Sequence, residues 1–176
     1  MRIIAGKYKK SNLHSVPGMT ARPTTDYLRE LVFSILGDVE NCEFLDLFAG
    51  SGSVGLEALS RGAHFVDFVD FSEKSIKTMI QNIQKLRCSD QCKIYRKKVS
   101  AFLKSRDKKY DLIFLDPPYE KDLVNKTIEA IFDLELLKPE GMIIIEHSQQ
   151  EKPAEKWNER LITQRIGGKT QITILK

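Results

Sequence analysis

The chain has 176 residues, of which 41% are hydrophobic and 30% are charged, and its formal net charge is +4. This length suits one domain with a full core and is short for two, so we take residues 1–176 as a single domain. The composition is that of a soluble globular protein. There is neither a signal-peptide core at the start nor an apolar run of membrane-spanning length, which predicts a cytoplasmic protein without a membrane partner.

The three cysteines and three histidines do not form a metal-binding pattern. Cys88 and Cys92 are separated by three residues, which is neither a zinc-knuckle nor a thioredoxin spacing. We therefore expect reduced cysteines and no metal site.

Positive charge is concentrated in two stretches of the chain. Residues 1–36 hold six Lys or Arg residues against two acids, and residues 85–109 hold ten against two. Such local excesses suit a polyanionic partner whose phosphates release counterions on binding. A solvated surface explains either stretch almost as well, so charge alone does not decide.

The chain is expected to begin with an extension over residues 1–36. Residues 2–5 and 12–16 read as the strands of a short basic hairpin. After a loop, residues 24–26 supply N-cap residues for a one-sided amphipathic helix, which Gly37 ends.

From residue 43 to residue 176 the pattern alternates between strands and helices and forms the expected catalytic core. Apolar runs bounded by turn residues indicate strands at residues 44–48, 65–70, 93–96, 111–115 and 142–146. Intervening segments indicate helices at residues 54–61, 72–86, 100–105 and 121–134. Right-handed crossovers then predict an α/β fold with a doubly wound, mostly parallel sheet. A hairpin over residues 161–166 and 171–175 adds an antiparallel strand at the end.

Residues 50–55 read Gly-Ser-Gly-Ser-Val-Gly, a G-x-G-x-x-G loop between a strand and a helix. Glycines let the backbone approach a ligand, and Asp70 at the end of the next strand is placed to bind ribose hydroxyls. Asp67 is a competing acid, but it precedes the carboxyl end of its strand, where open α/β sheets bind ligands. This loop by itself fits a dinucleotide oxidoreductase as well as a methyltransferase.

Asp46, just before the loop, helps to separate these two interpretations. A negative charge there would repel a pyrophosphate but would attract the cationic methionine part of S-adenosyl-L-methionine. Phe71 is placed to pack on the adenine, with a core phenylalanine as the alternative, and topology puts the Val99 amide near the same ring. The expected cofactor-binding residues are Asp46, Phe48, Ala49, Gly50, Ser51, Gly52, Asp70, Phe71, Val99 and Asp116.

The segment Asp116-Pro117-Pro118-Tyr119 follows the apolar run of the fourth strand. A carboxylate, two prolines that restrict the backbone and an aromatic ring suit a flat heterocycle with an exocyclic amine. The Asp116 carboxylate and the Pro117 carbonyl would accept the amine hydrogens, while Pro118 and Tyr119 contact the base. We expect Asp116, Pro117 and Tyr119 to be catalytic, and the alternative is a simple turn after a strand.

The chain resembles the RsmD-type methyltransferases of bacterial small-subunit ribosomal RNA, which modify guanine N2. The resemblance covers essentially the whole length and is carried by residues 2–7, 22–26, 46–52, 55–63 and 116–119. It implies a seven-stranded, Rossmann-like methyltransferase sheet and S-adenosyl-L-methionine as cofactor. It also implies a guanine of 16S ribosomal RNA as substrate, in free RNA or in an assembling small subunit.

The early basic excess and the Arg-Pro-Thr segment suggest which residues would bind this RNA. The expected substrate-binding residues are Lys9, Lys10, Arg22, Thr24, Pro118 and Tyr119. A local ion pair from Arg22 to Asp26 or Glu30 is an equally good interpretation of that arginine.

Three other functions share part of this pattern. A DNA adenine or cytosine amine methyltransferase would use the same segment, residues 116–119, to hold the base. However, the chain lacks an insertion large enough to read a DNA groove. Methylation of a protein glutamine would more typically use Asn at position 116. A non-catalytic RNA-binding module that keeps the cofactor for stability would not need an intact Asp116 and Tyr119.

Overall fold

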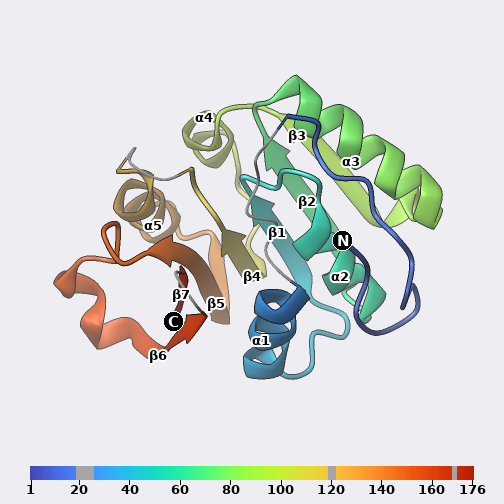
Figure 1. Ribbon diagram of the computed structural model, residues 1–176. Coiled ribbons are helices and arrows are strands. Elements are labelled where there is room, and N and C mark those ends of the chain that lie inside the picture. Colours follow the sequence, from blue (N-terminus) through green and yellow to red (C-terminus); the bar gives the residue numbers. More distant parts are fainter. Residues whose placement is uncertain (19–25, 119–121, 168–169) are drawn as a thin grey trace.

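The computed structural model describes residues 1–18, 26–118, 122–167 and 170–176. Its centre is a seven-stranded sheet in the order β3-β2-β1-β4-β5-β7-β6 (Figure 1). The strands are β1 (Glu43–Leu47), β2 (Phe65–Asp70), β3 (Cys92–Arg96), β4 (Tyr110–Leu115), β5 (Leu137–Ser148), β6 (Leu161–Gly167) and β7 (Thr170–Leu175). The first five strands pair in parallel, and β7 is antiparallel to both of its neighbours. The predicted fold class is therefore confirmed.

Helices cover both faces of the sheet (Figure 1). The helices are α1 (Asp26–Leu36), α2 (Ser53–Ser60), α3 (Glu73–Leu86), α4 (Val99–Lys104) and α5 (Leu123–Asp133), with short 3-10 turns η1 (Ser89–Gln91) and η2 (Glu155–Arg160). Their bounds lie within two residues of the predicted helices. None of the helices within the described ranges combines the length and the apolar character needed to cross a lipid bilayer.

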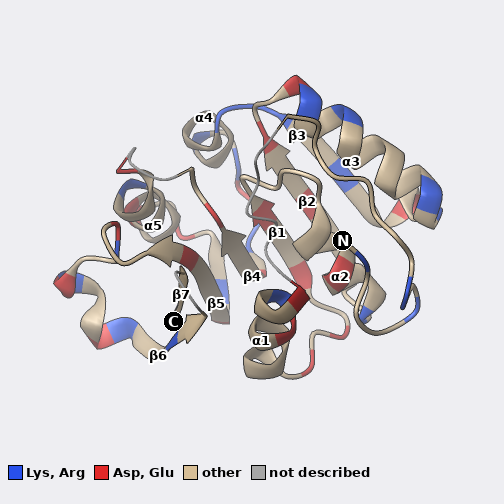
Figure 2. Cartoon of the chain, viewed as in Figure 1, with Lys and Arg blue, Asp and Glu red and all other residues tan. Residues whose placement is uncertain are grey.

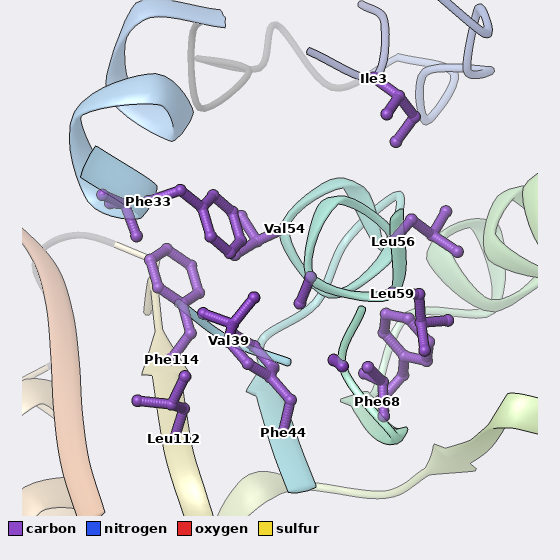
Figure 3. Close-up of a cluster of buried hydrophobic side chains, with 14 of the residues drawn as sticks. Ile3, Phe33, Val39, Phe44, Val54, Leu56, Leu59, Phe68, Leu112 and Phe114 are labelled. Atoms are coloured by element: carbon purple, nitrogen blue, oxygen red, sulfur yellow. The ribbon is translucent and has the colours of Figure 1, made fainter. Parts of the chain in front are cut away.

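Side-chain alternation along the strands divides the core into two layers. Phe44, Phe68 and Phe114 point to one face and pack with residues of α1, α2 and α3 (Figure 3). Leu45 and Ile113 point to the other face and pack with residues of α4 and α5. Since both faces are covered, the central strands are apolar throughout, as the continuous apolar runs predicted.

The chain reverses its direction of travel across the sheet after β3. It moves outward from β1 through β2 to β3, and then returns to place β4 on the other side of β1. This makes the carboxyl ends of β1 and β4 a topological switch point, where open α/β sheets leave a crevice for ligands.

The N-terminal segment, residues 1–18, docks on α2 and does not form the predicted hairpin in full. Its only strand pairing within the described residues is an isolated bridge between Arg2 and Asn12, so the expected strands at 2–5 and 12–16 are wrong in extent. The physical reason is a competing partner for the backbone. The Glu57 carboxylate accepts hydrogen bonds from the amides of Ile4 (2.8 Å) and Ala5 (3.0 Å), which ends the ladder.

Gly6 allows the segment to approach the end of α2. The Lys7 amide donates to the Ser60 carbonyl at 2.7 Å. Gly6 has φ +78°, and a Cβ built on it would lie 1.7 Å from the same carbonyl oxygen. A side chain at this position would therefore be both strained and in collision with backbone.

Gly6→Ala should destabilise the protein more than a matched glycine substitution. Gly37 also has a left-handed φ, +70°, but a Cβ at that position would have no atom within 4 Å, so Gly37→Ala isolates the cost of conformation. We expect Gly37→Ala to lower the free energy of unfolding by about 1–2 kcal/mol and Gly6→Ala by about 2–4 kcal/mol. Urea denaturation measures both values, and equal losses would contradict the proposed close contact.

Candidate functional site

The glycine loop lies at the switch point. β1 ends at Leu47, which pairs with Val69 of β2 and with Leu115 of β4. The loop that follows therefore starts between the carboxyl ends of two other strands. Gly52 serves as the N-cap of α2 with φ +77°, and the Gly52 amide donates to the Ala49 carbonyl at 2.7 Å.

Gly55 has a packing role in this loop-to-helix junction. A Cβ at Gly55 would lie 2.4 Å from Cε1 of Phe68, so the glycine lets α2 pack closely on β2. Such close helix-to-strand packing is one of the roles of the third glycine in G-x-G-x-x-G loops.

Asp70 ties the loop to the start of α3. One carboxylate oxygen accepts from the Gly50 amide at 2.8 Å, and the other accepts from the Ser72 amide at 2.7 Å. The side chain is half-buried at the carboxyl end of β2. The structure thus brings the predicted ribose-binding acid into contact with the predicted cofactor loop.

Asp67, the competing acid, serves a different part of the molecule. It accepts hydrogen bonds from the Tyr110 hydroxyl and from the Arg106 guanidinium, each at 2.7 Å. Asp67 is fully buried, and its side chain alternates to the sheet face opposite Phe68. Its interactions are those of a structural acid.

Asp46 is buried beneath the loop. Its carboxylate accepts from the Gly55 amide at 2.9 Å, and only 1% of the residue is exposed. Burial, reinforced by the nearby Asp70 charge, raises the pKa of Asp46 to about 7, while the bond from Gly55 acts in the opposite direction. The charge of this carboxyl group is therefore sensitive to pH near neutrality.

Asp116 follows β4 directly, beside the glycine loop. Because Leu115 pairs with Leu47, the next residues of the two strands, Asp116 and Phe48, emerge at the same level of the sheet. By alternation, Asp116 projects to the same face as Asp46. Asp116 is half-buried, Pro117 is buried and Pro118 is exposed. Tyr119 lies outside the described residues.

Phe71 and Val99 flank the same edge. Phe71 is 62% exposed, so the alternative of a core phenylalanine is wrong. The Lys98 ammonium lies 5.8 Å from the centre of the Phe71 ring. Val99 is buried and is the first residue of α4, where a backbone amide has no acceptor within its own helix.

The basic residues do not gather at one place. Lys9 and Lys10 are exposed near the docking point at the C-terminal end of α2, and α2 places that point about 10 Å from the glycine loop. Lys and Arg also mark both ends of α3 and the turn between β3 and α4 (Figure 2). Within the second basic stretch, Arg106 pairs with buried Asp67. Arg22 and Thr24 lie outside the described residues.

Two buried polar residues that the sequence analysis did not single out join the N-terminal segment to the rest of the protein. Glu57 is fully buried and holds the N-terminal segment. Asn82 is also fully buried, and its side chain contacts both His14 and Ser51. Both residues lie at polar positions of amphipathic helices, where the sequence pattern predicts exposure to solvent. Nothing in that pattern distinguishes them from exposed polar residues.

The fold and the site together define a Rossmann-like, class I methyltransferase. The defining features are the strand order with its single antiparallel strand β7, the glycine loop after β1 and the acid at the end of β2.

Comparisons with known proteins then identify the family. A family model described as "Conserved hypothetical protein 95" matches residues 1–176. Ribosomal RNA small subunit methyltransferase D of Buchnera aphidicola from Acyrthosiphon pisum is 36% identical over 85% of this chain and 78% of its own. The protein of the same name from Escherichia coli K12 is 32% identical over 83% of this chain and 74% of its own. The chain belongs to this family, and the resemblance seen in its sequence is confirmed.

A solved structure supports the same relationship. The Escherichia coli protein yhhF superposes with a TM-score of 0.87 at 30% identity, and the match covers 99% of this chain and 96% of that one.

Asp46→Asn tests the raised pKa through stability. The folded chain keeps a proton on Asp46 that the unfolded chain releases, so the stabilisation is full below the ordinary value of 3.8 and is lost as pH rises through about 7. We expect the free energy of unfolding of the wild type, relative to Asp46→Asn, to fall by up to about 1.4 kcal/mol per pH unit in this window. Urea denaturation from about pH 4 to about pH 8 measures it. A constant difference would show an ordinary pKa.

Proposed function

We propose that this chain transfers a methyl group from S-adenosyl-L-methionine to the exocyclic N2 amine of a guanine in 16S ribosomal RNA. The single observation that carries the proposal is the placement of Asp116 and Pro117 at the end of β4, level with the glycine loop that follows β1. Relatives named ribosomal RNA small subunit methyltransferase D support ribosomal RNA as the substrate. Residues 1–176 act as one methyltransferase domain in the cytoplasm.

The cofactor is held at the loop and at the ends of β1 and β2. The backbone from Phe48 to Gly52 faces the methionine part, and ionised Asp46 below it favours the cationic ammonium group. Asp70 binds the ribose hydroxyls, and exposed Phe71 packs on one face of the adenine. The Val99 amide, at the start of α4, serves the adenine edge.

The reaction forms a bond between nitrogen and the methyl carbon while the bond from sulfur to that carbon breaks and leaves its electron pair on sulfur. The amine is a poor nucleophile because its lone pair is delocalised into the base. Asp116 and the Pro117 carbonyl accept the amine hydrogens, which turns the lone pair towards the methyl group. The methylated nitrogen then loses one proton to Asp116, and S-adenosylhomocysteine remains.

The base reaches Asp116 and Pro117 from single-stranded RNA or after flipping out of a stem. Tyr119 stacks on the base, which contributes about 1–3 kcal/mol for an aromatic residue, and Pro118 forms the adjacent wall. Arg22 and Thr24 contact the RNA backbone. Lys9 and Lys10 contact phosphates farther away, since they lie at the other end of α2 from the loop.

Methylation of a DNA base is the second candidate, because residues 116–119 accept any planar ring with an exocyclic amine. The N-terminal segment is docked on α2 and α3 and adds no element of a length suited to groove reading. This favours RNA over duplex DNA.

Asp116→Ala should separate catalysis from cofactor binding. We expect the methylation rate of undermodified small ribosomal subunits to fall by about 10²–10⁴-fold, because both the orientation of the amine and the proton acceptor are lost. Affinity for S-adenosylhomocysteine, measured by calorimetry, should change by less than about threefold, since Asp46, Asp70 and the loop remain.

Asp90→Ala is the matched control. Asp90 is an exposed acid in η1, so this variant should keep full activity. Labelled methyl transfer to naked DNA, but not to ribosomal RNA, would overturn the proposed substrate. Retention of activity by Asp116→Ala would overturn the proposed mechanism.

Lys9→Ala combined with Lys10→Ala should weaken RNA binding without affecting the cofactor. If each lysine neutralises one phosphate, the slope of log affinity against log salt should decrease by about 2. The double variant Lys126→Ala and Lys156→Ala removes the same charge outside both basic stretches, where the lysines pair with Asp122 and Glu129. Filter binding of a ribosomal RNA fragment at several salt concentrations compares the two double variants. Identical slopes would show that Lys9 and Lys10 do not contact RNA phosphates.

A further inference from the structure

Asn82 of α3 joins the N-terminal segment to the glycine loop. Its Oδ1 accepts from the His14 amide at 2.7 Å, and its Nδ2 donates to the His14 carbonyl at 3.1 Å. The same Nδ2 donates to the Ser51 carbonyl at 2.9 Å. One fully buried side chain thus binds two pieces of backbone that are 37 positions apart in sequence.

This arrangement uses the hydrogen-bonding capacity of the amide to a high degree. Both Nδ2 hydrogens have an acceptor, and the pair of bonds to His14 imitates the pairing of two peptide groups. A buried amide is costly unless these partners are in place, so loss of either backbone piece penalises the other.

The segment contacts the loop at a second point and continues towards the ligand edge of the sheet. The Ser51 hydroxyl lies 3.9 Å from the Met1 sulfur. From His14 the chain runs back along α3, and Gly18 lies near the Lys74 ammonium at the first turn of that helix (Figure 1). Residues 14–18 therefore connect the Asn82 contact to the edge where Asp70 and Phe71 emerge.

We infer that Asn82 is a positioning residue that couples docking of the N-terminal segment to the conformation of the glycine loop. Ser51 is one of the loop residues assigned to the cofactor, so the inference rests on the proposed function in that respect. Cofactor bound at the loop stabilises the docked segment, and the docked segment raises affinity for the cofactor. Because such coupling is reciprocal, it is measurable from either side.

The first experiment uses the wild-type protein and hydrogen exchange with S-adenosylhomocysteine. The His14 amide, bonded to Asn82, should exchange about three- to tenfold more slowly with ligand, the range expected for one net hydrogen bond. The Ala154 amide, which donates to the Asn125 side chain outside the N-terminal segment, should slow less. Equal slowing of both amides would indicate general stabilisation, and no slowing at His14 would indicate no coupling. Either outcome overturns the inference.

The second experiment uses Asn82→Ala and Asn125→Ala as a matched pair. Asn125 of α5 also bonds to backbone on both sides of its amide, at Lys152 and Ala154, but it does not contact the glycine loop. Asn82→Ala should lower affinity for S-adenosylhomocysteine by about three- to tenfold and abolish the ligand effect at His14. Asn125→Ala should retain both the affinity for S-adenosylhomocysteine and the effect of this ligand on exchange of the His14 amide. Equal effects of the two variants would overturn the inference.

A measurement without ligand distinguishes this inference from the proposed function. Asn82→Ala should speed exchange of the Gly52 amide, which closes the loop onto Ala49, and Asn125→Ala should not. Failure of the wild type to bind S-adenosylhomocysteine would count against the proposed function alone. An unchanged Gly52 amide in folded Asn82→Ala would count against the inference alone. If that variant does not fold, Asn82→Asp replaces it. Asn82→Asp keeps the acceptor for the His14 amide but loses the donor to the Ser51 and His14 carbonyls.

Discussion

The register of β1 against its two parallel neighbours is the constraint on which the candidate site depends. Leu47 pairs with Val69 on one side and with Leu115 on the other, so three strands end within one residue of the same level. The glycine loop, Asp70 and Asp116 leave the sheet at these three ends. A shift of one residue in either pairing would turn an acid to the opposite face of the sheet, because side chains alternate along a strand.

Buried polar groups connect the rest of the chain to this centre. Glu57 holds the amides of Ile4 and Ala5, Asn82 holds His14 and Ser51, and Asp46 holds the first turn of α2. Each of these groups would be unfavourable inside the protein without its partner. The N-terminal segment is therefore a layer of the folded protein rather than an appendage, and it covers the polar sides of two helices.

The parts of the fold that were predictable have local causes. Continuous apolar runs indicated the central strands because both faces of the sheet are covered, and Gly37 marked the end of α1 by its left-handed conformation. The expected hairpin at the start was overextended, because the pattern of residues 2–5 carries no sign that Glu57 captures their amides. β5 likewise starts at Leu137, five residues before its predicted start, since Leu137 pairs with Tyr110 across an irregular step.

The sequence by itself determined the class of fold, the glycine loop and the positions of Asp70 and Asp116 at strand ends, because these depend on apolar runs, turn residues and chain order. Only the tertiary structure decided that Asp67 has a structural role, that Phe71 is exposed and that Glu57 and Asn82 are buried. The hydrogen bonds of the buried Glu57 and Asn82 side chains join residues 31 to 68 positions apart. A local pattern shows which side of a helix is polar, but it does not show whether water or another part of the chain covers that side.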